Sequence, residues 1–126
     1  GVKRGLSVCG SDGLDEITVT GPTHCCEIRD DKLTSYDISP EQFGLKTCEL
    51  KDIVGGTPEE NAQITKDILS GKQQGAKRDI ILMNAGMAIY LGRDDISKED
   101  AVKLAADIID SGKAYQKMEQ FVKACQ

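Results

Sequence analysis

Two adjacent carboxylates near the start of the chain are the residues best suited to chemistry. Asp15 and Glu16 follow a turn-forming Gly-Ser-Asp-Gly segment at residues 10–13, which itself follows a short apolar run at residues 6–9. Mg²⁺ prefers oxygen ligands and is often held by one or two carboxylates together with substrate phosphates. The pattern therefore predicts a magnesium site at the end of a strand, with Asp15 and Glu16 as ligands. A pair of solvated acids at a turn is the alternative, and composition alone favours it.

Other candidate residues carry weaker signals. Gly10 and Gly13 could cradle a phosphate through backbone N–H groups, but a lone Gly-x-x-Gly is usually only a turn. The single histidine, His24, stands beside two cysteines in a predicted strand, so a packing or edge role is expected. Asn84 lies in an apolar segment and is expected to satisfy a neighbouring backbone group rather than bind substrate. No side chain is predicted to act as a catalytic acid or base.

Composition excludes several classes of function. The 126 residues are enough for one domain at most. Sixteen basic and 21 acidic residues give a net charge of -5, which argues against nucleic acid and anionic membrane surfaces as partners. No segment approaches the ~20 apolar residues that a membrane span needs. Five irregularly spaced cysteines with one histidine argue against a disulfide framework or zinc site, and favour reduced thiols in the cytoplasm.

The first part of the sequence has the pattern of strands. Residues 5–9 are predicted to form a buried strand, and residues 17–20 alternate in the manner of a second one. Residues 24–29 and 33–38 predict a β-hairpin whose turn is Asp30-Asp31. A short helical turn is expected at Pro40, ended by Gly44.

Helix signals dominate residues 57–126. A capping box begins the first helix at Thr57, and Gly71 ends it. Residues 78–91 are apolar nearly all round, which predicts a central helix. A second capping box at Ser97 begins the third helix, and residues 111–112 separate it from the last. The last helix is expected to bury Tyr115, Met118, Phe121 or Val122, and Cys125.

Together these patterns predict an α/β fold in one domain spanning residues 1–126. Its N-terminal half holds a mixed sheet with a β-hairpin, at residues 5–40, and its C-terminal half holds about four helices, at residues 57–126.

An ordered set of matches resembles the anthranilate phosphoribosyltransferase family. The segment Asp12-Gly13-Leu14-Asp15-Glu16 resembles the Asp-Gly-Leu-Asp-Glu signature of that family. The ordered set is specific, although each piece alone is weak. The further matches are Tyr36 through Pro40, Phe43-Gly44-Leu45, Gly55-Gly56, Glu60-Asn61-Ala62, Ile68-Leu69-Ser70-Gly71, Arg78-Asp79, Asn84-Ala85, Ala105 and Asp110-Ser111-Gly112-Lys113-Ala114.

The resemblance implies an activity and a fold. It implies a partial catalytic domain of the nucleoside phosphorylase/phosphoribosyltransferase type. The implied enzyme is a pentosyltransferase that moves the phosphoribosyl group of phosphoribosyl pyrophosphate (PRPP) to anthranilate in tryptophan biosynthesis. It also implies that Asp15 and Glu16 bind Mg²⁺ associated with PRPP. Cys9 stands where many family members have histidine.

The resemblance also implies that the chain is a C-terminal part of a longer protein. Family members are more than twice as long, with an N-terminal helical domain and a pyrophosphate-binding Gly-Thr-Gly-Gly-Asp loop. The chain alone is therefore expected to be inactive and to self-associate through an exposed helical face, while the full-length enzyme is expected to be a homodimer. The alternatives are a non-enzymatic protein-interaction domain and another enzyme of the nucleoside phosphorylase superfamily.

Overall fold

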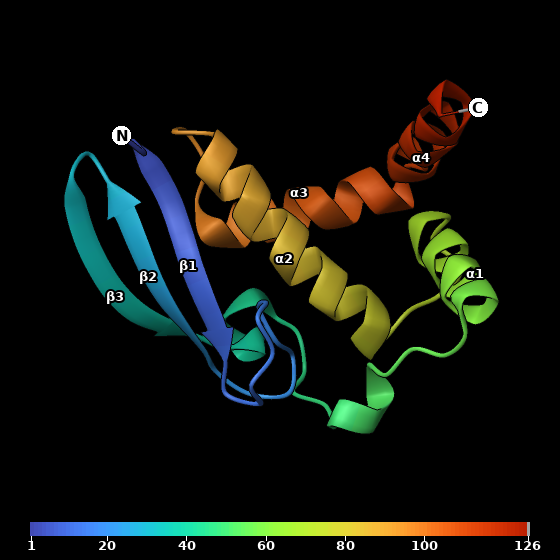
Figure 1. Ribbon diagram of the computed structural model, residues 1–126, viewed down its shortest axis with the longest axis horizontal. Helices are drawn as coiled ribbons and strands as arrows, with labels where there is room; N and C mark the ends of the chain where they lie inside the picture. The colour runs from blue at the N-terminus through green and yellow to red at the C-terminus, as the bar shows by residue number, and fades with distance from the viewer. Residues whose placement is uncertain (126) are drawn as a thin grey trace.

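The computed structural model describes residues 1–125, in which a three-stranded sheet is followed by four helices (Figure 1). The strands are β1 (Arg4–Gly10), β2 (Thr23–Arg29) and β3 (Lys32–Ile38), and two short 3₁₀ helices follow, η1 (Pro40–Phe43) and η2 (Leu50–Asp52). The helices are α1 (Pro58–Leu69), α2 (Ala76–Gly92), α3 (Lys98–Asp110) and α4 (Lys113–Ala124). The predicted α/β class is confirmed. No helix within residues 1–125 has the length and apolar character that crossing a membrane requires.

The sheet has the order β1-β2-β3, and both of its ladders are antiparallel. The predicted hairpin is confirmed: Asp30 (φ 50°) and Asp31 (φ 62°) make the turn between β2 and β3 with positive φ at both central residues. Such turns match the twist of the flanking strands. A mixed sheet was expected, but the described strands pair only in antiparallel fashion. The chain returns through a tight turn and a loop, without the long crossover that parallel pairing needs.

The strand predicted at residues 17–20 is not present. Ile17, Thr18 and Val19 are all buried, so the segment does not alternate between two faces. The N–H groups of Ile17, Thr18 and Thr20 bond to side chains instead of to a neighbouring strand, as the Thr18 N–H does to the Thr23 hydroxyl at 3.0 Å. The alternation of apolar residues and threonines therefore reflects a buried loop held by polar side chains.

Helices α1 and α3 begin at the predicted caps, but only α1 has the complete capping box. The Thr57 hydroxyl accepts the Glu60 N–H, and the Glu60 carboxylate accepts the Thr57 N–H at 2.7 Å, which completes the capping box of α1. The Ser97 hydroxyl accepts the Asp100 N–H at 3.0 Å at the start of α3. These bonds satisfy backbone donors that have no partner inside the helix.

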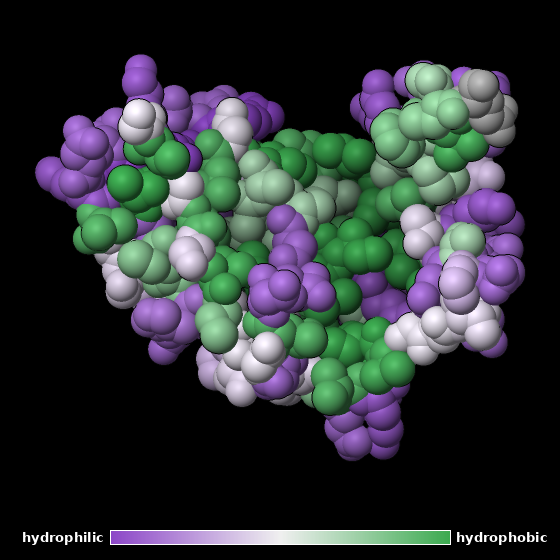
Figure 2. Space-filling model, in the orientation of Figure 1, coloured by the Kyte–Doolittle hydropathy of each residue, from purple (hydrophilic) through white to green (hydrophobic). Residues whose placement is uncertain are grey.

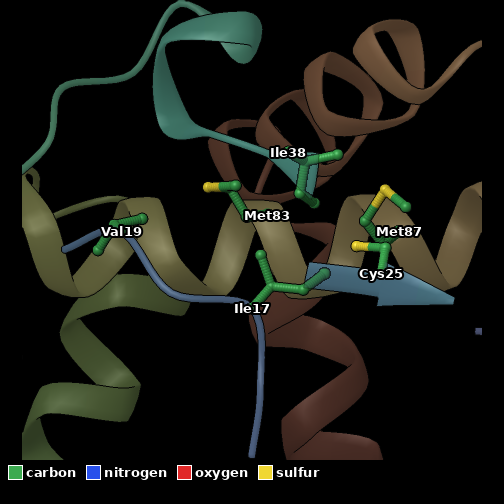
Figure 3. Packing of buried hydrophobic residues seen from close by; sticks show 6 residues of the cluster. All are labelled: Ile17, Val19, Cys25, Ile38, Met83 and Met87. Carbon is green, nitrogen blue, oxygen red and sulfur yellow. The ribbon is translucent and has the colours of Figure 1, made fainter. Parts of the chain in front are cut away.

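Helix α2 lies in the middle of the molecule, with the sheet on one side and α3 on the other (Figure 1). Met83 and Met87 of α2 pack against Ile17, Val19, Cys25 and Ile38 from the loop and sheet (Figure 3). Leu82 of α2 belongs to a second cluster, which also contains Ile68, Val102, Ala105 and Ile109 of α1 and α3. Because apolar residues are needed on both faces, α2 is apolar nearly all round, and its predicted central position is confirmed.

A polar cluster also ties the sheet to the helices. The Tyr36 and Tyr90 hydroxyls donate to the buried Glu27 carboxylate at 2.7 and 3.0 Å. The Lys98 ammonium lies 3.5 Å from the centre of the Tyr36 ring. Burial and the bond to Glu27 raise the pKa of Tyr36, so its hydroxyl remains a donor. Four elements, β2, β3, α2 and α3, are joined by this cluster.

The expected burial of the last helix is wrong. No residue of α4 is buried, and the side chains of Phe121 and Val122 are 67% and 48% exposed. The apolar stripe of α4 is present in the sequence, but within residues 1–125 it is covered only in part: Tyr115 and Met118 are half-buried, while Phe121 and Val122 are exposed. The reason is visible in Figure 1, where α4 stands away from the sheet and α2.

We predict that Gly86→Ala destabilises the chain by about 1–3 kcal/mol, because it overpacks the contact between α2 and α3. A Cβ at Gly86 would lie 2.7 Å from the Val102 Cα and 2.9 Å from the Val102 backbone nitrogen. Gly92→Ala is the control, since no atom lies within 4 Å of its added Cβ at the end of the same helix. Urea unfolding midpoints compare the two variants, and equal stabilities would contradict the prediction.

Candidate functional site

The loop that carries Asp15 and Glu16 joins β1 to β2 and is closed at its base. The Gly10 N–H donates to the Leu14 carbonyl at 2.9 Å, and the Ser11 N–H donates to the Pro22 carbonyl at 3.0 Å. Gly13 has φ +87° and donates its N–H to the Gly10 carbonyl at 3.0 Å. A side chain would strain that conformation, so the glycine is required for the turn. The predicted turn at residues 10–13 is confirmed.

Asp12 organises the interior of this loop. Its Oδ2 accepts hydrogen bonds from the Thr18 and Thr20 hydroxyls, each at 2.5 Å, and its Oδ1 accepts the Leu14 N–H at 3.1 Å. Burial alone would raise the pKa of Asp12, but the hydrogen bonds outweigh it and hold the pKa below its ordinary value. The ionised carboxylate is therefore used within the loop. This role of Asp12 was not predicted from the sequence, although an Asp two residues before a backbone donor is a known turn signal.

Asn84 of α2 clamps the loop from the other side. Its Oδ1 accepts the Ile17 N–H at 3.1 Å, and its Nδ2 donates to the Ile17 carbonyl at 2.8 Å and the Ile80 carbonyl at 2.9 Å. The bond to Ile80 confirms the expected role toward a neighbouring backbone group. The clamp on Ile17, the residue directly after Glu16, was missed because it joins residues 67 positions apart.

Asp15 and Glu16 remain at the surface, directly before the buried residues that the Asn84 bonds hold in place. Ile17, Thr18 and Val19 are buried, whereas Asp15 and Glu16 are exposed. No ion pair within residues 1–125 engages either carboxylate. The carboxylates of Asp15 and Glu16 are therefore adjacent on a loop whose backbone is held by the hydrogen bonds of Asp12 on one side and of Asn84 on the other.

The carboxylates of Asp15 and Glu16 fit a Mg²⁺ site in which the protein supplies only one or two of the metal's ligands. Nowhere in residues 1–125 do three or more His, Cys, Asp or Glu side chains form a group that could hold a metal. Mg²⁺ commonly keeps several waters and takes one or two carboxylates plus substrate phosphates. Asp15 and Glu16 match that pattern, and their role as ligands remains a prediction.

A largely apolar groove of ≈ 430 Å³ is lined in part by Glu16. Lys77 of α2 is the basic residue of its lining, and apolar residues make up most of the walls. These wall residues include Leu14, Ile53, Ile64, Ile68, Ile80 and Ile81. Figure 2 shows the same side of the molecule as a hollowed, mostly hydrophobic face. One of the predicted ligands, Glu16, therefore lies beside a concave, mostly apolar surface.

His24 does not take the role that was expected from the sequence. It lies on the central strand β2 rather than at an edge, and its side chain is 63% exposed rather than packed in the core. Its Nδ1 lies 2.8 Å from Oδ1 of Asp37 on β3. The strand register explains the difference, because His24 points to the solvent face while Cys25 points inward.

Known proteins resemble the chain over nearly its whole length. The profile described as glycosyl transferase family, a/b domain, matches residues 1–115. The anthranilate phosphoribosyltransferase of Lachnoclostridium phytofermentans is 52% identical over 123 residues, which are 98% of this chain and 36% of that protein.

Solved structures of relatives have the same fold as this chain and match nearly all of it. The anthranilate phosphoribosyltransferase from Thermus thermophilus is 34% identical with a TM-score of 0.86, over 95% of this chain and 35% of that one. The enzyme from Saccharomyces cerevisiae in complex with PRPP and Mg is 31% identical with a TM-score of 0.87, over 95% and 34%. The chain spans about a third of the length of the relatives that it matches.

We predict that Asn84→Ala destabilises the chain by about 2 kcal/mol or more, because it leaves the buried N–H and C=O of Ile17 without partners. Asn61→Ala is the control, since Asn61 makes the same pair of bonds to the exposed Gly56, at 2.8 and 3.0 Å. Urea unfolding gives the two stabilities, and hydrogen exchange should quicken at the Ile17 amide only in Asn84→Ala. Equal losses in both variants would contradict the prediction.

We also predict that the stabilising effect of Asp12 depends on pH. Its folded-state pKa lies below the ordinary value of 3.8, so ionised Asp12 stabilises the fold above that pH and loses the effect as the pH falls below it. Asp12→Asn should therefore be less stable than the parent at pH 7, and the difference should shrink in acid. Asp31→Asn, at an exposed turn, controls for the loss of one charge. A difference that is constant between pH 7 and pH 2.5 would count against this account.

Proposed function

The chain belongs to the glycosyl transferase family, a/b domain, and from this membership we propose that it forms part of an enzyme that transfers the phosphoribosyl group of PRPP to anthranilate. Relatives named anthranilate phosphoribosyltransferase support the reaction, since one is 52% identical over 98% of the chain. The observation that carries the proposal is the exposed Asp15–Glu16 pair on a loop braced by Asp12 and Asn84.

In the proposed enzyme, Asp15 and Glu16 hold Mg²⁺ together with the diphosphate of PRPP. The structure of the Saccharomyces cerevisiae relative in complex with PRPP and Mg supports the proposal that metal and PRPP bind together. Bound Mg²⁺ would neutralise charge on the departing pyrophosphate. The two carboxylates supply oxygen ligands at a fixed place, and no proton transfer is assigned to them.

The hydrogen-bonded order of the loop matters for this role because it lowers the entropy that is lost when the metal and diphosphate bind. A flexible loop would have to be ordered each time the metal and diphosphate bind, which costs conformational entropy. Here the Asp12 carboxylate and the Asn84 amide have already ordered the backbone on both sides of the acidic pair. Such preorganised groups stabilise developing charge without further rearrangement.

A non-enzymatic interaction domain is the second candidate, and the exposed Phe121 and Val122 on α4 favour it. An apolar stripe of this kind can contact a partner protein without any metal at the acidic loop. The two proposals differ at Asp15 and Glu16, which take part only in the enzymatic one.

Four related expectations stay predictions. They are a cytoplasmic location, a homodimer of the full-length enzyme, self-association of this chain through its exposed helical face, and lack of activity in this chain alone. The last follows from the chain spanning about a third of its relatives, so that other parts of the enzyme would have to supply the remaining substrate contacts.

We predict that Mg²⁺ added with PRPP shifts the backbone amide signals of residues 15–17 in NMR spectra. The combined variant Asp15→Asn, Glu16→Gln should lose this response, with apparent affinity lowered about tenfold or more, because both oxygen ligands lose their charge.

The combined variant Asp30→Asn, Asp31→Asn is the matched control for that titration. It removes the same charge from another exposed adjacent pair, and asparagine suits the positive φ angles of 50° and 62° at that turn. This control should respond as the parent does. Equal responses from the two combined variants, or no response in the parent, would favour the interaction domain.

A further inference from the structure

Three side chains with complementary chemistry form one row across the solvent face of the sheet. The register pairs Cys9 of β1 with His24 of β2, and His24 with Asp37 of β3. Directly paired residues on one face have Cβ atoms about 4.5–5.5 Å apart. The imidazole Nδ1 lies 2.8 Å from the Asp37 carboxylate, and Cys9 is an exposed thiol. The sequence alone did not reveal this row, because the three residues are far apart along the chain.

The row opens into a surface hollow of ≈ 380 Å³. Cys9, His24 and Asp37 line it together with Gly10, Ser11 and Pro22. The last three residues belong to the base of the Asp15–Glu16 loop, so an adduct on Cys9 would lie beside that loop.

We propose that Cys9 is a reversible modification site whose thiol exchanges with a small-molecule disulfide, with His24 as proton acceptor and Asp37 as the positioning residue. The carboxylate of Asp37 engages Nδ1 and thereby leaves Nε2 to take a proton. This role concerns the chain itself and holds whether or not the chain serves a phosphoribosyltransferase.

The exchange balances without any further reactant. The Cys9 proton passes to His24, and the thiolate sulfur attacks one sulfur of the disulfide. A new S–S bond forms to Cys9 while the old S–S bond breaks. The leaving thiolate takes the proton from His24, so the products are a mixed disulfide at Cys9 and one free small thiol.

The other cysteines lack this arrangement and provide internal comparisons. Burial raises the pKa of Cys25 to about 11, and burial also raises the pKa of Cys48. Cys26 lies on the same sheet face as Cys9, but its register partners are Ser7 and Ser35. Cys125 is exposed on the far side of the chain, after α4.

The test is the rate of mixed-disulfide formation with glutathione disulfide on the 126-residue chain, followed for each cysteine by peptide mass mapping. At pH 7, Cys9 should react about tenfold or more faster than Cys125, the fold-change expected for a thiol assisted by a neighbouring base. His24→Gln should bring Cys9 down to the rate of Cys125, and Asp37→Asn should lower it partway.

The pH dependence of the Cys9 rate distinguishes assistance by proton transfer to His24 from the effect of solvent exposure alone. Near pH 10 thiols ionise without help, so the difference between the parent and His24→Gln should vanish there. Since His24 and Asp37 are exposed, both variants should keep the fold, and continued protection of Cys25 checks this. Equal rates for Cys9 and Cys125 at pH 7, or an unchanged Cys9 rate in His24→Gln, would overturn the proposal.

Discussion

The hydrogen bonds between the Asn84 amide and the backbone of Ile17 are the constraint on which the candidate site depends. They fix the residue that follows Glu16 to the central helix, at 3.1 and 2.8 Å. Burial of Ile17 behind that clamp makes the bonds costly to break, since water cannot replace the lost partner. The exposed acids therefore occupy a defined position although their own side chains are solvated.

Helix α2 has this influence because it contacts both halves of the molecule. One of its faces packs against the sheet and the acidic loop, and the other against α1 and α3. The Glu27 cluster adds a polar connection between sheet and helices on the same helix, through the Tyr90 hydroxyl. A change in the packing of α2 would consequently reach the loop that carries Asp15 and Glu16.

The sheet has two chemically different faces: the inner face packs against the helices, and the outer face is exposed to solvent. The inner face supplies Cys25 and Glu27 to the contacts with the helices, where burial raises the pKa of the Cys25 thiol. The outer face presents the row of Cys9, His24 and Asp37 to solvent. Strand β1 ends and β2 begins at the acidic loop, so the proposed metal site and the proposed thiol site share one end of the sheet.

The sequence by itself determined the hairpin, the capped helices, the central helix and the acidic pair, because turn residues, caps and hydrophobic periodicity act over a few neighbouring positions. Tertiary structure decided the rest. Residues 17–20 became a buried loop because Thr23 and Asn84, contributed by other elements, satisfy its backbone. Phe121 and Val122 of the apolar stripe of α4 stayed exposed because a stripe predicts burial only where a partner surface exists. The pairing of Cys9 with His24 and Asp37 needed the strand register, which no local pattern specifies.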